Sequence, residues 1–184
     1  NRNWHPFLAD TLGEMSRAGV RRAVGVIAAA HRSYSSCTQY KENVAAARAT
    51  LRERGLADVE VTYVGDWHTH PGFIGANAER VRDAIATLPP ALQERAELVF
   101  TAHSIPVSMA DKYPYRQQFE ETSRLVAANV NATRPPDGWL DHAAVYQSRS
   151  GRPEDPWLGP DVGEYLRALT ARHVEAAILS PAGF

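Results

Sequence analysis

His103 stands where a strongly apolar stretch ends, a position at which a side chain can do chemistry. Residues 98–101 predict a buried strand, which delivers Ala102-His103-Ser104-Ile105-Pro106. Pro106 cannot donate to a sheet ladder, so the strand must end by then. Open α/β sheets bind ligands at the carboxyl ends of their strands, and a neutral imidazole can bind a metal or accept a proton. Spacing alone favours the plainer alternative, a histidine that hydrogen-bonds a loop.

A second candidate site is the pair His68 and His70, which form an H-x-H-P pattern directly after another predicted strand. Two histidines at such a point suit zinc. The pattern also resembles the zinc-binding core of the metallopeptidases that cleave ubiquitin-like tails. That family has a serine and an aspartate downstream, where this chain has Ala78 and Val81. A zinc hydrolase using His68 and His70 is therefore the lesser alternative, and two polar loop histidines lining a cleft are the plainer one.

Several common functions are disfavoured by what the sequence lacks. Neither G-x-x-x-x-G-K nor G-x-G-x-x-G follows the first predicted strand, so no phosphate-binding loop or dinucleotide fingerprint is expected. A net charge of -1 gives no reason to expect nucleic acid as a partner. No apolar run approaches the roughly 20 residues that span a bilayer. With one cysteine and no visible signal peptide, the expected location is cytoplasmic.

Strand-like and helix-like patterns alternate along the chain. Apolar runs predict strands at 21–30, 59–64, 98–101, 141–147 and 174–179. Apolar residues at helical spacing predict helices at 6–19, 36–55, 74–88, 119–130 and 161–169. Ser36 and Gln39 form the expected capping box of the second helix. The alternation predicts an α/β fold, an open parallel sheet with helices on both faces, as a single domain over residues 1–184.

The residues around His103 resemble the signature of the ferrochelatases. The match comprises F-T-A-H-S-I-P with Asp111 and the Pro114-Tyr115 pair, and it departs at Tyr113, where that signature has a glycine. Further likenesses follow in the family's order: W-H-P-F near the start, residues 31–40, Gly65-Asp66-Trp67, and Q-S-R followed by P-W-L-G-P at 147–160. The resemblance implies a Rossmann-like chelatase fold. It also implies insertion of ferrous iron, Fe2+, into a porphyrin in heme biosynthesis.

By this resemblance, His103 is the catalytic residue and binds Fe2+, and Tyr40 contacts the porphyrin near the metal. Tyr34 and Trp157 offer aromatic faces to a flat apolar ring, although either could equally pack in the core. Arg149 can pair with a porphyrin carboxylate in bidentate fashion, and is as easily a solvated loop charge.

The S-Y-S-S-C-x-Q-Y form at 33–40 resembles a bacterial branch of the family. That branch metallates coproporphyrin III in preference to protoporphyrin IX. In part of it, the cysteine matching Cys37 joins three downstream cysteines to hold a 2Fe-2S cluster. Cys37 is otherwise a small, mostly buried residue, and both readings stay open.

The chain starts without methionine and stops at Phe184, directly after an apolar strand. The expectation is therefore the second half of a two-domain enzyme. By resemblance, the missing parts are the first half, which forms the opposite wall of the porphyrin cleft, and a carboxyl-terminal segment with a catalytic carboxylate. The isolated fragment is expected to be inactive. A porphyrin-binding or heme-binding domain without catalysis is the other alternative.

Overall fold

The computed structural model describes residues 3–152 and 154–183, and these divide into two compact units, Asn1–Gly65 and Asp66–Phe184. Helices and strands alternate, and every paired strand is parallel, which confirms the predicted α/β class. The described strands form one two-stranded and one three-stranded sheet. A single domain over residues 1–184 stays a prediction. None of the helices within the described part of the chain is long and apolar enough to cross a membrane.

The first unit is a two-stranded parallel sheet with two helices. Its elements are α1 (Leu8–Arg17), β1 (Arg22–Gly25), a π-helical turn η1 (Tyr34–Thr38), α2 (Gln39–Glu53) and β2 (Glu60–Tyr63). A small apolar core lies between the two α-helices and the strands: Leu12, Ala47, Leu51 and Val59. Gly19 and Gly55 follow the two α-helices with positive φ angles of 85° and 67°, a conformation that glycine adopts at little cost.

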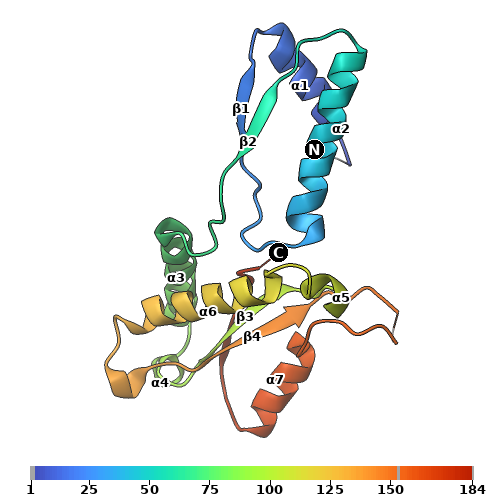
Figure 1. Cartoon of the computed structure of the whole chain (residues 1–184). Coiled ribbons are helices and arrows are strands. Elements are labelled where there is room, and N and C mark those ends of the chain that lie inside the picture. Colours follow the sequence, from blue (N-terminus) through green and yellow to red (C-terminus); the bar gives the residue numbers. More distant parts are fainter. Residues whose placement is uncertain (1–2, 153, 184) are drawn as a thin grey trace. The chain divides into compact units, whose positions relative to one another are not determined.

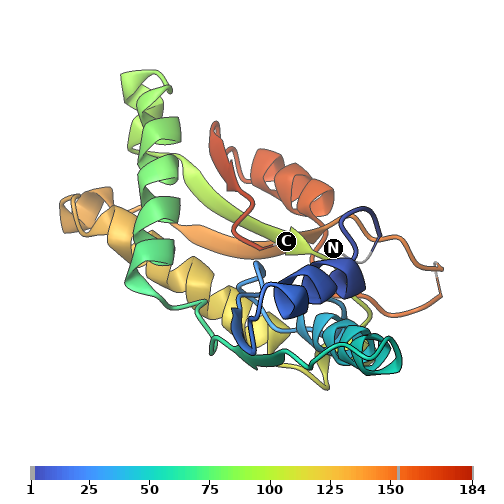
Figure 2. The same cartoon turned by 90° about the horizontal axis from the view of Figure 1, so that it is seen from above.

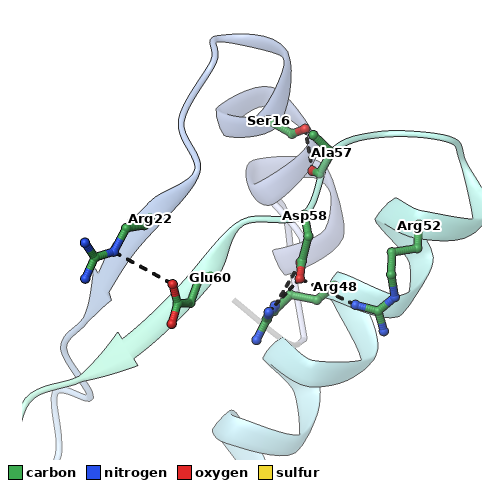
Figure 3. Close-up of polar contacts among 7 residues, drawn as sticks. All are labelled: Ser16, Arg22, Arg48, Arg52, Ala57, Asp58 and Glu60. Carbon is green, nitrogen blue, oxygen red and sulfur yellow. Dashed lines mark hydrogen bonds and ion pairs between the residues drawn. The ribbon is translucent and has the colours of Figure 1, made fainter.

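Polar contacts tie the entry of β2 to both helices of this unit (Figure 3). Arg48 on α2 donates two hydrogen bonds to the carboxylate of Asp58, at 2.9 and 2.6 Å. This guanidinium holds the pKa of Asp58 below its usual range. The Ser16 hydroxyl of α1 donates to the carbonyl oxygen of Ala57 at 2.7 Å. Strand β2 thus starts at a point fixed by side chains as well as by its ladder.

The second unit contains a three-stranded parallel sheet of order β4-β3-β5. Its elements are α3 (Pro71–Ala86), α4 (Pro90–Gln93), β3 (Glu97–His103), α5 (Val107–Ala110), α6 (Tyr115–Asn131), η2 (Pro136–Gly138), β4 (His142–Gln147), α7 (Val162–Ala171) and β5 (Ala177–Ser180).

The central strand β3 is buried on both faces. Leu98, Phe100 and Ala102 belong to the core that α3 and α6 cover, whereas Val99 packs with Leu169 of α7. Figure 2 shows α6 and α7 on opposite sides of this sheet. Side chains alternate between the faces of a strand, so a run of consecutive apolar residues is what a doubly covered strand needs. Helices on both faces are thereby confirmed for this sheet.

Candidate functional site

His103 is the last residue of β3, at the carboxyl end of the central strand. Its Cα partner on β4 is Gln147, the last residue of that strand. His103 is half-buried, whereas the six residues before it on the strand are buried. The predicted position of His103 at the end of a buried strand is therefore confirmed. Its catalytic role stays a prediction.

Ser104 fixes the chain immediately after this histidine. Its backbone N–H donates to the carbonyl oxygen of Gln147 at 2.7 Å. Its hydroxyl, which is buried, donates to the carbonyl oxygen of Leu158 at 2.8 Å. A buried hydroxyl needs such a partner, and here the partner comes from a segment 54 residues away.

The P-W-L-G-P segment lies antiparallel to the residues that follow Ser104. Pro106 and Trp157 form an antiparallel bridge. The N–H of Leu158 donates to the Ile105 carbonyl oxygen, and the N–H of Val107 donates to the Pro156 carbonyl oxygen, both at 3.0 Å. The structure thus brings Trp157 beside the segment that leaves His103.

Trp157 and Arg149 are held by the loop that joins them. The Trp157 indole is half-buried and lies against Gly151 so closely that a Cβ at Gly151 would overlap the ring. Arg149 donates through Nη2 to the carbonyl oxygens of Arg152 and Asp155, at 3.0 and 2.9 Å. Roles in porphyrin binding stay predictions for both side chains. A guanidinium has five N–H donors, so a porphyrin carboxylate would have to bind the Arg149 donors that do not bond the loop carbonyl oxygens.

Two buried tyrosines lie close to this end of the sheet, and the sequence analysis assigns a role to neither. The Tyr115 hydroxyl donates to the carbonyl oxygen of His103 at 2.9 Å. Burial raises the pKa of Tyr115 above its usual range, so the phenol stays a proton donor. Burial also raises the pKa of Tyr146, to about 12. Among the described residues, the Tyr146 hydroxyl has no hydrogen-bond partner. The sequence signal at Tyr115 is its place in the Pro114-Tyr115 pair of the signature.

Helix α6 also fixes the Asp66-Trp67-His68 corner of the second unit. The Gln118 side chain donates to the Asp66 carboxylate at 2.9 Å, and the Thr122 hydroxyl donates to the carbonyl oxygen of His68 at 3.0 Å. The Trp67 ring packs edge-on against Phe73 of α3, with centroids 5.0 Å apart. The corner is therefore a rigid part of this unit.

His68 and His70 each have a structural partner. His68 Nε2 lies 3.1 Å from a carboxylate oxygen of Glu121. His70 is the N-cap of α3, and its Nδ1 accepts from the Gly72 N–H at 3.1 Å. Ala78 and Val81, which replace the polar residues of the zinc family, are core residues of α3. The described residues contain no group of three or more His, Cys, Asp or Glu side chains that could hold a metal ion. This geometry gives the zinc alternative no support.

In the first unit, Tyr34 and Cys37 lie on the π-helical turn and Tyr40 lies at the start of α2. Ser33, not Ser36, is the N-cap, and its capping-box partner is Ser36, so the predicted Ser36–Gln39 box is wrong. The Tyr34 hydroxyl donates to Glu42 at 2.9 Å. Both tyrosines are 37% exposed, and Cys37 is partly buried. π-Helical turns are rare in proteins, and those that occur are frequently found at functional sites.

Comparison with known proteins identifies the relatives of this chain. The family model described as Ferrochelatase matches residues 1–184. The chain is 43% identical to the coproporphyrin III ferrochelatase of Mycolicibacterium vanbaalenii and 42% identical to that of Nocardia farcinica. It is 41% identical to a protein of Rhodopirellula baltica named ferrochelatase. Each match covers 100% of this chain but 52%, 52% and 50% of the respective relative. The chain thus spans about half the length of these curated relatives.

Proposed function

We infer, from the premise that this chain belongs to the ferrochelatase family, that the complete protein inserts ferrous iron into a porphyrin. We propose coproporphyrin III as its preferred substrate over protoporphyrin IX. The relatives from Mycolicibacterium vanbaalenii and Nocardia farcinica, at 43% and 42% identity, are both named coproporphyrin III ferrochelatase. The structural observation that supports the proposal best is the half-buried His103 at the carboxyl end of the central strand.

Iron insertion asks for three things from a protein. Water must leave Fe2+, two pyrrole N–H protons must leave the ring, and the macrocycle must bend so that its nitrogens face the metal. A histidine can serve the proton step, because neutral imidazole accepts a proton near neutral pH. His103 is proposed for this role and as a transient ligand of the incoming Fe2+. Both protons then pass to solvent as the ring becomes a dianion around the metal.

The ring itself would be held by other groups. Trp157 can stack on the macrocycle through the part of its indole that Gly151 does not cover. Arg149 can pair with a propionate. In the first unit, Tyr34 and Tyr40 are proposed as porphyrin contacts on the strength of their match to the family's residues, and both keep more than a third of their surface exposed.

The direct test uses the full-length protein with Fe2+ under anaerobic conditions and coproporphyrin III or protoporphyrin IX. Metalloporphyrin formation is followed by absorbance. We expect faster turnover of coproporphyrin III, and no metallation by the 184-residue chain alone. Tight porphyrin binding without conversion would favour the non-catalytic binding domain. Stoichiometric zinc in the purified protein would revive the hydrolase alternative.

A 2Fe-2S cluster in the full-length protein is a finer part of the proposal. Cys37 is the one cysteine of this chain, so it can supply one of the four thiolates that such a cluster needs. Its Sγ lies 3.7 Å from the Ser36 hydroxyl, which can donate to a thiolate. Hydrogen bonds to cluster sulfurs are one way in which a protein tunes such a site.

For Cys37 we expect that the full-length wild type purifies with the visible absorbance of an iron–sulfur cluster and that Cys37→Ser removes it. The matched control is Ser35→Ala, on the same turn, which should keep the colour. A colourless wild type, or a coloured Cys37→Ser protein, would contradict the assignment of Cys37 as a ligand.

A further inference from the structure

Strand β3 loses its β5 neighbour before it reaches His103. Strand β5 pairs with residues 97–100 of β3, and the last pair is Phe100 with Ser180. After that, the N–H of Gly183 donates to the Thr101 carbonyl oxygen at 3.0 Å. In a parallel strand, alternate residues direct their backbone groups to the same side. Residues 97 and 101 bond on the β5 side, so residue 103 directs its carbonyl there too.

Tyr115 takes the place of the missing strand at that carbonyl. Its hydroxyl donates to the His103 oxygen at 2.9 Å. The Tyr115 ring is 1% exposed and lies in the same core cluster as Phe119. A carbonyl that loses water without gaining a donor is unfavourable. The phenol satisfies this carbonyl with a side chain that the core itself holds rigid.

The other edge of β3 is fixed by the backbone. The N–H of Ser104 donates to the Gln147 carbonyl oxygen of β4 at 2.7 Å. The carbonyl oxygen and the N–H of the one peptide group that links His103 to Ser104 are thus held from opposite sides, the oxygen by Tyr115 and the N–H by β4. Of these two ties, the bond from Tyr115 can be removed by deleting a single side-chain oxygen.

We propose that Tyr115 is a positioning residue for His103 in the proposed iron insertion. By holding the last peptide of β3, the phenol determines where the imidazole stands relative to the pyrrole nitrogens. Displacements of about 1 Å in a reacting group can cost about 100-fold in rate. Tyr115 acts through His103, so its loss should lower the rate of the chemical step and leave porphyrin affinity unchanged. This inference rests on the function proposed above.

Tyr146 provides a matched control for this proposal. It lies in the same core cluster, and its ring contacts that of Phe119 with centroids 5.5 Å apart. Its side chain is as buried as that of Tyr115, but no described residue accepts from or donates to its hydroxyl. Removing the Tyr146 oxygen therefore makes the same chemical change without breaking a hydrogen bond seen in the structure. Deleting an unpaired buried hydroxyl is expected to be neutral or stabilising.

The experiment compares wild type, Tyr115→Phe and Tyr146→Phe in the full-length protein. It measures kcat and KM for coproporphyrin III with Fe2+, porphyrin Kd by fluorescence titration without iron, and Tm. We expect kcat of Tyr115→Phe to fall about tenfold, part of the range that misplacement of a reacting group can cost. Its porphyrin Kd should stay at the wild-type value. Tyr146→Phe should keep the wild-type kcat and Kd.

Each other outcome has a definite meaning. Equal kcat values for the two variants, with an active wild type, would overturn the role of Tyr115 and leave the proposed function standing. Loss of porphyrin affinity together with kcat, or failure of Tyr115→Phe alone to fold, would show that the hydroxyl serves the fold and not His103. A wild type that binds porphyrin and does not metallate it would overturn the proposed function, and this inference with it.

Discussion

In the full-length protein, His103→Ala is expected to lower the rate of iron insertion by about 10²–10⁴-fold while porphyrin affinity changes little, because a positioned general base contributes a factor of that size. Alanine keeps the strand but can neither accept a pyrrole proton nor approach Fe2+. Contact with the ring is spread over many groups, whereas proton removal depends on one. Turnover with Fe2+ and the porphyrin Kd, measured on the same preparation, check both halves of this prediction.

His142→Ala is the control for this experiment. His142 is exposed and begins β4, at the opposite end of the same sheet from His103. Its loss should leave turnover within twofold or so of wild type, because surface substitutions away from special features usually change stability by only about 0.5 kcal/mol. Turnover of His103→Ala close to that of His142→Ala would remove His103 from the mechanism.

Phe100→Ala is expected to lower the free energy of unfolding of the second unit by about 3–5 kcal/mol, the usual cost of emptying a buried phenylalanine site. Phe100 is fully buried at the centre of β3, within the core that α3 and α6 cover. Whole domains are stable by only about 5–15 kcal/mol. The variant should therefore unfold at a much lower urea concentration, as read from the fluorescence of Trp67, Trp139 and Trp157, which all lie in this unit.

Leu179→Ala provides the comparison for Phe100→Ala. Leu179 lies on β5 of the same sheet but is 50% exposed, so its removal leaves a smaller cavity and loses less apolar burial. We expect less than half the loss of stability. If Phe100→Ala shifted the urea midpoint no more than Leu179→Ala does, β3 would not be the centre of the core in solution.

Features that depend on a few neighbouring residues could be predicted from the sequence. The apolar run at 98–101 predicts strand β3, and Pro106 sets a limit on where it can end. The end of the strand near His103 can therefore be predicted from the sequence. Asp161, at the start of the helix predicted at 161–169, is a residue type that favours the N-cap, and its carboxylate accepts from the N–H groups of Gly163 and Glu164. Gly19 and Gly55 are the last residues of the helices predicted at 6–19 and 36–55, and both have the positive φ of a helix-ending glycine. In each case the physical cause lies within about one helical turn or one strand.

Features that depend on partners far away in the chain could not be predicted in the same way. The apolar run at 21–30 favours a long strand, yet β1 ends at Gly25 because its ladder is with β2, which ends at Tyr63. Ser33 and Ser36 are equally able to cap a helix, and hydrogen bonds with each other and with the His31 carbonyl decide between them. The short helices α4 and α5 have too few residues to show a period. Tyr115 meets His103 only in the folded unit.

The order in which β3 acquires its neighbours has a consequence for synthesis on the ribosome. Strand β3 is complete in the chain at His103, but the groups that surround its end come later: Tyr115, Gln147, Leu158 and Gly183. Because the chain emerges from its amino end, about 80 further residues must be synthesised after His103 before Gly183 can bond to β3. Chains grow by about 5–20 residues per second. Until residues 142–147 have emerged, the apolar strand has neither of its two neighbours, and it lacks β5 until residue 180. A nascent chain stalled before residue 140 would therefore expose β3 and depend on chaperones to stay unaggregated.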